Sequence, residues 1–306
     1  MKPRQDVYDT YWKLAAERQE IFFKKLKGLP PPFTKDPILN TYKFCNTYRA
    51  SDRVSQFLIK DVIYGFKTIE EDTLFRTFFF RLLNKIETWS ALEQKLDRIT
   101  LKNFDVGKYT QAIEGLRKSG QAVYGNAFIL CANKAFGYDK KHENHLALLE
   151  HVFVKTKKAL ELINSKSLED LFKNLRELPL IGNFMAYQIA IDFNYSEVFN
   201  FSENDFTIAG PGAIRGIRKC FESTNGKDND YVISHMVENQ EKEFERLGIK
   251  FKDLWGRSMH AIDCQGMFCE TDKYSRVHFP DLKSNRTKIK TKFKPSPNLI
   301  SYFYPP

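Results

Sequence analysis

Apolar residues recur at three- and four-residue spacing along most of the 306-residue chain, which is the pattern of amphipathic α-helices. The first such stretch, residues 6–28, ends at Gly28 before a proline-rich breaker. Residues 70–89 are apolar nearly all round and predict a buried helix. No sustained β alternation is found, so the pattern predicts an all-α fold. Further helices are expected over residues 46–63, 108–120, 145–165, 167–178, 183–193, 213–223, 230–248 and 251–274.

The C-terminal segment, residues 276–306, differs from the helical part. It is basic, carries prolines and has no helical period. We expect a basic extended C-terminal arm that lies on the domain or on DNA, with a solvated tail as the alternative. No other segment has the composition of a linker. The sequence therefore predicts one helical domain over residues 1–275, built of two lobes around a cleft.

The charge balance indicates that this helical protein binds a polyanion. Lysine and arginine number 48 against 38 acidic residues, a net charge of +10. Aromatic residues make up 14% of the chain and supply both core and surfaces on which bases could stack. A basic surface of this kind suits nucleic acid, although charge alone does not prove binding.

Localisation and metal content follow from simpler features. No stretch approaches the length of apolar chain that spans a membrane, and the N-terminus carries charges where a signal peptide is apolar. We therefore expect a cytoplasmic protein without a membrane partner. The five cysteines are odd in number and scattered, which favours reduced thiols. Cys264 and Cys269 have no second pair of cysteine or histidine ligands near them in the sequence, so no metal is expected.

The turn Leu178–Gly182 lies between two predicted helices and defines a hairpin over about residues 168–195. Glycine permits a positive φ, and the first amides of the following helix have no partner within it. Such a helix N-terminus attracts anions, so Leu180, Gly182 and Asn183 are candidate phosphate contacts. A plain packing corner between two helices is the alternative.

The stretch LPLIGNFMAYQIA, residues 178–190, resembles the helix-hairpin-helix element of the DNA glycosylase superfamily. In that superfamily a catalytic aspartate follows the hairpin, and here Asp205 and Glu203 occupy the corresponding region. The resemblance implies a helix-hairpin-helix glycosylase-like fold. Asn183 and Phe184 stand where two-function members carry a lysine nucleophile, which favours a single-function enzyme. The iron–sulfur motif of the superfamily is absent.

A second resemblance covers most of the chain. The motifs are NTYRASDRVSQFLI, FFFRLLNKIETW, ENDFTIAGPGAIRGIRKCF and DCQGMFCETDKYSR. They are similar to a helical family found with phage thymine hypermodification systems. Its members include the helical domain of a hydroxymethyluracil-DNA kinase and α-glutamyl/putrescinyl-thymine pyrophosphorylases. Some relatives act as anti-phage glycosylases.

Carboxylates are the candidate catalytic groups for cleaving an N-glycosidic bond, because positive charge builds on the sugar. Asp205 is the first candidate and Glu203 the second, while Glu270 and Asp272 are rivals. Asp205 as the N-cap of a following helix is the structural alternative.

A second candidate phosphate site is the glycine-rich turn at Gly210 and Gly212, which leads into Arg215, Arg218 and Lys219. Glycines let the main chain approach a phosphate, and the cations add charge. An unspecialised loop is the alternative. The chain contains no GxxxxGK[ST] motif, so we expect no kinase activity from this polypeptide alone.

Polar residues at helical spacing suggest the wall of a base pocket. They are Asn46, Arg49, Asp52, Arg53 and Gln56, joined by Lys273 and Tyr274 from the C-terminal part. Arginine forks can hold a carboxylate or phosphate. A buried polar network, or ordinary salt bridges at a helix end, would give the same pattern.

Together these observations predict a single-function DNA glycosylase that flips and excises a modified pyrimidine, in antiviral defence. The alternatives are a transferase that installs an amine or amino acid on pyrophosphorylated hydroxymethyluracil in DNA, and a non-catalytic DNA-binding module. The expected partner is double-stranded DNA containing modified bases. No cofactor is expected, apart from a monovalent cation that could bind at the hairpin. The oligomeric state stays open.

Overall fold

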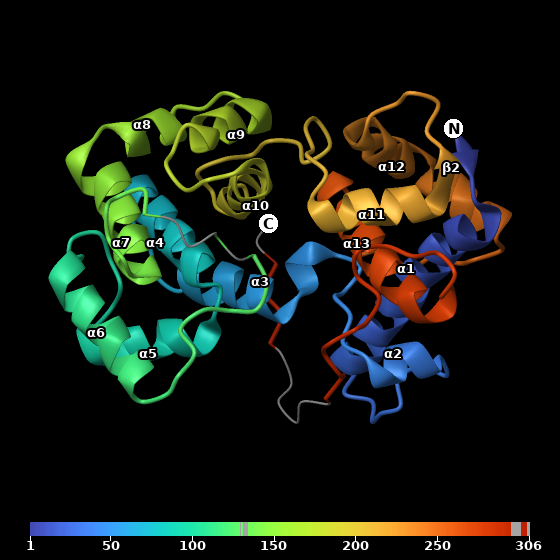
Figure 1. The fold of residues 1–306 in the computed structure, drawn as a ribbon, viewed down its shortest axis with the longest axis horizontal. Helices are drawn as coiled ribbons and strands as arrows, with labels where there is room; N and C mark the ends of the chain where they lie inside the picture. The colour runs from blue at the N-terminus through green and yellow to red at the C-terminus, as the bar shows by residue number, and fades with distance from the viewer. Residues whose placement is uncertain (129, 131–133, 295–300, 305–306) are drawn as a thin grey trace. The chain divides into compact units, whose positions relative to one another are not determined.

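The computed structural model describes residues 1–128, 130, 134–294 and 301–304. Its described part is mostly helical, with two short strands, so the all-α prediction is confirmed (Figure 1). Cys131 and part of the predicted arm, residues 295–300, 305 and 306, lie outside the described residues. The chain forms two compact units. Unit 1 holds residues 1–52 and 206–302, and unit 2 holds residues 53–205 and the chain end from Phe303.

Unit 1 is built around three long helices. Its elements are β1 (Lys2–Pro3), α1 (Gln5–Leu26), α2 (Pro37–Thr41), the 3-10 helix η1 (Arg49–Ser51), α11 (Pro211–Cys220), β2 (Phe221–Ser223), α12 (Asn229–Arg246) and α13 (Ala261–His278). The two strands pair antiparallel. Aromatic residues of α1 fill the core: Tyr11 and Trp12 are fully buried and meet Phe268 of α13 and Phe244 of α12.

Helix α11 lies very close to α13 because two glycines face the contact. A Cβ at Gly216 would lie 2.1 Å from the carbonyl oxygen of Phe268, and one at Gly212 would lie 2.7 Å from the Cys269 Sγ. Neither distance is tolerated by a real side chain. Small residues four positions apart let two helix backbones approach in this way. The close approach brings the side chains of α11 within reach of the carboxylates on α13.

Unit 2 contains the remaining described helices. They are α3 (Arg53–Phe57), the π-helix η2 (Leu58–Ile63), α4 (Glu70–Leu83), α5 (Ile86–Leu96), α6 (Val106–Lys118), α7 (Lys141–Glu150), the π-helix η3 (His151–Lys155), α8 (Lys158–Ile163), α9 (Leu168–Arg176) and α10 (Asn183–Phe193). Helix α4 is the centre of the core, as its apolar pattern predicts: Phe75, Phe78, Phe79 and Phe80 are all buried.

A buried ion pair joins α4 to α10. Arg81 forms a bidentate contact with Asp192, and its Nη2 lies 2.9 Å from Oδ1. The two side chains are 1% and 0% exposed. The same guanidinium donates to the Asn84 side chain at 2.7 Å and lies over the Phe128 ring. Because every contact of this pair is far from water, it fixes the position of α10 against the core.

Five helix predictions are wrong in their extent, among them the helix over residues 213–223, whose last three residues form β2. The helix expected over residues 46–63 is interrupted at Asp52, which is extended. Asp52 accepts the Asn46 N–H, and Asn46 donates to the Ser51 carbonyl, so local side-chain bonds replace helical ones. Residues 70–89 divide at Asn84, which is left-handed with φ 47°. The stretch 145–165 ends its π-helix at Thr156, which is extended.

The helix expected over residues 251–274 begins only at Ala261. His260 caps it and forms a capping box with Asp263, so the helix starts where the first amides find partners. Its last residue is His278, three positions beyond the predicted end of the helical domain at 275. None of the helices in the described ranges is long and apolar enough to cross a membrane.

Candidate functional site

The predicted hairpin is present in unit 2 as α9, a turn and α10. Ser167 caps α9 through the Asp170 N–H, and Gly182 is the N-cap of α10. The turn does not use the positive φ that glycine permits: Gly182 has φ −87°, and Leu180 carries the positive φ of 70°. Arg176 closes the turn by donating to the Ile181 carbonyl. Gly182 and Asn183 are exposed, and no side chain caps α10. Their predicted phosphate contact stays a prediction.

The carboxylates that follow the hairpin have different surroundings. Asp205 is exposed, and its backbone N–H donates to the Ser202 carbonyl at 3.3 Å. Glu203 is only 7% exposed. No helix begins at Asp205, so the N-cap alternative is not what the structure shows. Both residues belong to unit 2, whereas the rival carboxylates Glu270 and Asp272 belong to unit 1.

Asp272 of α13 is the centre of a cationic cluster in unit 1. It is fully buried, and three cations reach its carboxylate. Arg215 Nε lies 3.0 Å and Arg276 Nη2 2.6 Å from Oδ2, while Lys219 Nζ lies 3.0 Å from Oδ1. Lys219 also donates to the Asp272 carbonyl at 3.2 Å. Arg215 and Lys219 are two of the predicted phosphate ligands, and the glycine contact of α11 with α13 brings them here.

The charges of this cluster do not cancel. Three cations surround one carboxylate, which leaves two positive charges in excess. Burial alone would raise the pKa of Asp272, but hydrogen bonds and charge from Arg276 and Lys219 lower it below the ordinary aspartate value. The Arg276 Nε is buried without a hydrogen-bond partner in the described chain. Such an excess of partly buried positive charge favours an anion, and phosphate is one of the anions whose geometry an arginine fork matches.

The remaining predicted ligands of α11 differ in exposure. Gly210 is the buried N-cap, Gly212 faces Cys269, and Arg218 is exposed. The predicted phosphate-binding role of these three residues is untested and stays a prediction. Arg276 was not predicted, although its position one turn after Asp272 is the signal that would have found it.

A second polar cluster of unit 1 unites residues that are distant in the sequence. Glu270 accepts the Cys45 N–H at 3.0 Å and the Lys273 ammonium at 2.6 Å. Beside them, Arg18 donates to the Asn46 side chain at 3.1 Å and to the carbonyls of residues 44 and 45. Asn46, Asp52 and Lys273 of the predicted pocket are thus brought together with Glu270, which was predicted as a rival catalytic carboxylate. The sequence analysis did not name Arg18 as a member of this cluster. In the helical pattern it looks like an ordinary polar residue on the solvent side of an amphipathic helix, but it is buried.

Asp52 is the titrating member of this cluster. Burial raises the pKa of Asp52 to about 6, and the charge of Glu270 adds to the effect, while the Asn46 N–H and Arg18 oppose it. Burial, reinforced by Arg18, lowers the pKa of Lys25 to about 8. A carboxylate that exchanges its proton near neutral pH is suited to proton transfer.

Replacing Asp52 by asparagine should remove a pH dependence of stability. The folded-state pKa lies above the ordinary 3.8, so folding favours the protonated carboxyl. That stabilisation is complete below about pH 4 and is lost as pH rises through 6. Relative to the unaltered chain, the variant should gain up to about 2–3 kcal/mol between pH 4 and pH 7.5. Urea unfolding at both pH values measures this, with the exposed Asp281→Asn as control. A parallel pH profile for the two chains would contradict it.

Other predicted pocket residues lie elsewhere. Arg53 and Gln56 belong to unit 2, where Arg53 pairs with Glu87 at 3.6 Å and Gln56 accepts the Phe303 N–H at 2.7 Å. Arg49 in η1 is buried, and its backbone N–H donates to Asp263. Tyr274 donates to Asp36 at 2.6 Å. Of the seven predicted pocket residues, Asn46, Asp52 and Lys273 share a cluster with Glu270 in unit 1, and the predicted pocket wall stays a prediction.

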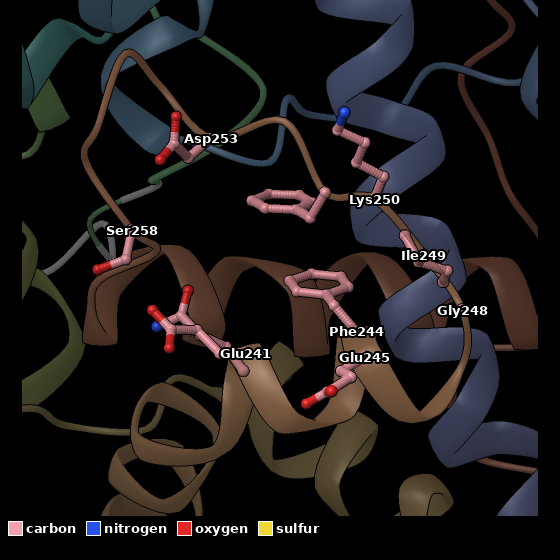
Figure 2. Close-up of a pocket in the computed structure, with 10 residues that line it drawn as sticks. Glu241, Phe244, Glu245, Gly248, Ile249, Lys250, Asp253 and Ser258 are labelled. Carbon is pink, nitrogen blue, oxygen red and sulfur yellow. The ribbon is translucent and has the colours of Figure 1, made fainter.

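A depression of about 530 Å³ in unit 1 is lined by none of the residues that form the two clusters (Figure 2). The rings of Phe244 and Phe251 stack at 4.2 Å in its wall. Figure 2 shows carboxylates around it, from Glu241 and Glu245 of α12 and from Asp253 of the following loop. This acidic lining repels phosphate, so the depression is not a candidate for the DNA backbone.

Comparison with known proteins identifies the kind of domain. Residues 5–284 match the family described as 5-hmdU DNA kinase, helical domain. The chain is also similar to the 5-hmdU DNA kinase of Bacillus phage SP10, with 26% identity over 288 residues. That match covers 88% of this chain and 45% of the relative, so the chain spans less than half the length of the relative. No solved structure matches the chain.

These matches overturn the prediction of a base-excising glycosylase. Both matched descriptions are of a DNA kinase, a phosphotransferase, and neither is of a hydrolase of N-glycosyl bonds. The predicted catalytic roles in base excision are therefore withdrawn for Asp205, Glu203, Glu270 and Asp272. The resemblance to the helical family of phage base modification is confirmed at the level of the kinase helical domain. The chain belongs to the family of 5-hmdU DNA kinase helical domains.

Proposed function

We propose that this chain binds DNA containing 5-hydroxymethyldeoxyuridine (5-hmdU) and holds the modified base for phosphorylation of its hydroxymethyl group. The observation that carries the proposal is the family match over residues 5–284. It is supported by the net charge of +10 and by the excess positive charge around Asp272, where Arg215 and Arg276 can contact a backbone phosphate.

The reaction assigns different tasks to the acceptor and the donor. The hydroxymethyl oxygen forms a bond to the γ-phosphorus of a nucleoside triphosphate, the bond to the β–γ bridging oxygen breaks, the nucleoside diphosphate leaves, and the hydroxyl proton passes to a general base or to solvent. Catalysis of this step rests on positioning and electrostatics. In the proposal this chain positions the acceptor. In the proposal a separate nucleotide-binding part holds the phosphoryl donor, since the matched relative is more than twice as long as its matched segment and this chain has no GxxxxGK[ST] motif.

The test is a binding comparison between two duplexes that differ at one base. Fluorescence anisotropy should show tighter binding of the purified chain to a duplex with one 5-hmdU than to the same duplex with thymine. Recognition of a single buried hydroxyl is worth about 1–3 kcal/mol, or roughly a 5- to 150-fold difference in Kd. Equal affinity for the two duplexes would contradict the proposal.

Mass analysis of the incubated DNA provides the second readout. With the chain alone the 5-hmdU strand should keep its mass, and no free base should appear. When the nucleotide-binding part of a related kinase and a nucleoside triphosphate are added, the strand should gain one phosphate. Release of the base would contradict the proposal, and so would phosphorylation that proceeds equally without this chain.

A further inference from the structure

Within the C-terminal arm, residues 286–294 have a cation at every second position. From residue 286 to residue 294 its sequence is RTKIKTKFK, with uncharged residues between the cations. Strict alternation over this length is the pattern of an extended segment with two different faces. The sequence analysis missed this two-residue period. Such a period is usually recognised from alternating apolar residues, and here most of the alternating residues are cations.

The arm is fixed to unit 1 by its backbone. The Lys43 N–H donates to the Thr291 carbonyl at 3.0 Å, and the Phe293 N–H donates to the Thr41 carbonyl at 2.9 Å. These bonds form an antiparallel bridge between Tyr42 and Lys292. Arg276 of the Asp272 cluster also donates to the Lys288 carbonyl at 3.2 Å.

The two faces of the arm have different surroundings. Ile289 and Phe293 are half-buried, and the Lys25 ammonium lies 4.8 Å from the centroid of the Phe293 ring. The five cations are all exposed: Arg286, Lys288, Lys290, Lys292 and Lys294. We call this row the arm cations. None of them forms an ion pair with a carboxylate of the described chain, and no acidic residue follows Asp281.

The spacing of the arm cations suits a polyanion that runs along them. Alternate residues of an extended chain are about 6.6 Å apart, so the row is about 26 Å long. One DNA strand carries roughly eight phosphates over that length of helix axis. The unpaired cations therefore meet a continuous line of negative charge, and counterion release gives a favourable free energy.

We propose that the arm cations bind the sugar–phosphate backbone of the substrate DNA. The inference rests on the proposed function and extends it by naming a surface. Contacts to phosphate carry no sequence information, so this surface contributes affinity for 5-hmdU and thymine duplexes alike. Base recognition belongs to another part of the chain.

The salt dependence of binding tests the arm directly. Lys288, Lys290, Lys292 and Lys294 are replaced together by glutamine, which keeps most of the side-chain length and removes four charges. The slope of log K against log salt concentration should become shallower by about 3.6, or 0.9 for each phosphate that the arm no longer neutralises. Because all four side chains are exposed, the variant should unfold at the temperature of the unaltered chain.

The matched control removes the same charge from unit 2. Lys60, Lys102, Lys108 and Lys118 are exposed and are replaced together by glutamine. This variant has the same net charge as the arm variant, and its slope should change by less than about 0.9, the value for one neutralised phosphate. Equal changes in the two variants, or an arm change below that value, would overturn the inference.

Lysine acetylation of the unaltered chain gives an independent readout. A thymine duplex should protect the arm lysines several-fold more than Lys102, Lys108 and Lys118. Unprotected arm lysines would overturn the inference. Equal affinity for thymine and 5-hmdU duplexes, with the arm protected and the slope changed, would contradict the proposed function alone, so the two failures are distinguishable.

Discussion

Replacing Asp272 by alanine should lower the free energy of unfolding by about 3–5 kcal/mol. The carboxylate is fully buried and is the counter-ion of Arg215, Lys219 and Arg276. Without it, three cations repel one another in a site where water cannot solvate them completely. Urea unfolding should show a lower midpoint with an unchanged dependence on urea concentration.

The control for this variant is an ion pair on the surface of the same unit. Glu222 lies 2.6 Å from Lys2, and both side chains are well exposed. Glu222→Ala should leave the urea midpoint almost unchanged, because an exposed ion pair contributes little to stability. If Asp272→Ala costs no more than the control, the cluster is not held by its carboxylate.

The pH profile gives the same cluster a second signature. The folded-state pKa of Asp272 is lowered, so its contribution to stability is present above the unfolded value and is lost as pH falls through the folded value. Between pH 7 and pH 5 the difference between the unaltered chain and Asp272→Ala should stay constant. It should shrink only in strongly acidic solution.

The second large effect is expected at the ion pair between α4 and α10. Asp192→Ala leaves Arg81 charged and 1% exposed, and should destabilise unit 2 by about 3–5 kcal/mol. Because Asp192 lies on the second hairpin helix, the variant should also loosen the turn at Gly182. Hydrogen exchange of the α10 amides should accelerate by about the factor that the lost free energy predicts.

A double replacement separates the effect of an unpaired buried charge from the effect of side-chain shape. Arg81→Met combined with Asp192→Leu replaces both charges with apolar side chains of similar size. Such replacements of buried pairs are often neutral or stabilising, so the double variant should recover most of the lost free energy. A double variant as unstable as Asp192→Ala would show that shape, and not unpaired charge, controls the site.

Much of the fold follows from helical periodicity, and the exceptions have two different causes. Helix α1 lies where its apolar pattern predicts, and α4 begins at the predicted residue although it ends at Leu83. The expected helix over 46–63 is broken because Asp52 and Asn46 bond to nearby backbone groups, and periodicity does not register those bonds. Leu180 adopts the left-handed turn conformation that the sequence would assign to glycine, because tertiary packing overrides the local preference.

The candidate site could be predicted only in pieces. Residue type alone was enough to name four members of the second cluster: Asn46, Asp52, Glu270 and Lys273. Sequence spacing could not predict that α13 contacts residues 45–52, because that contact arises from three-dimensional packing. The reaction was beyond local reasoning. A carboxylate beside a hairpin fits excision as well as it fits phosphoryl transfer, and only the match along most of the chain separates them.

The glycines of α11 also constrain how this family can vary. At position 212 the obstacle is the side chain of Cys269, so a larger residue becomes possible when residue 269 shrinks. At position 216 the obstacle is the backbone oxygen of Phe268, which no substitution on α13 can remove. The residue at position 212 can therefore change together with residue 269, whereas no second substitution can compensate for a larger residue at position 216. Relatives that keep the cationic cluster around Asp272 should retain glycine at position 216 even where most other residues differ.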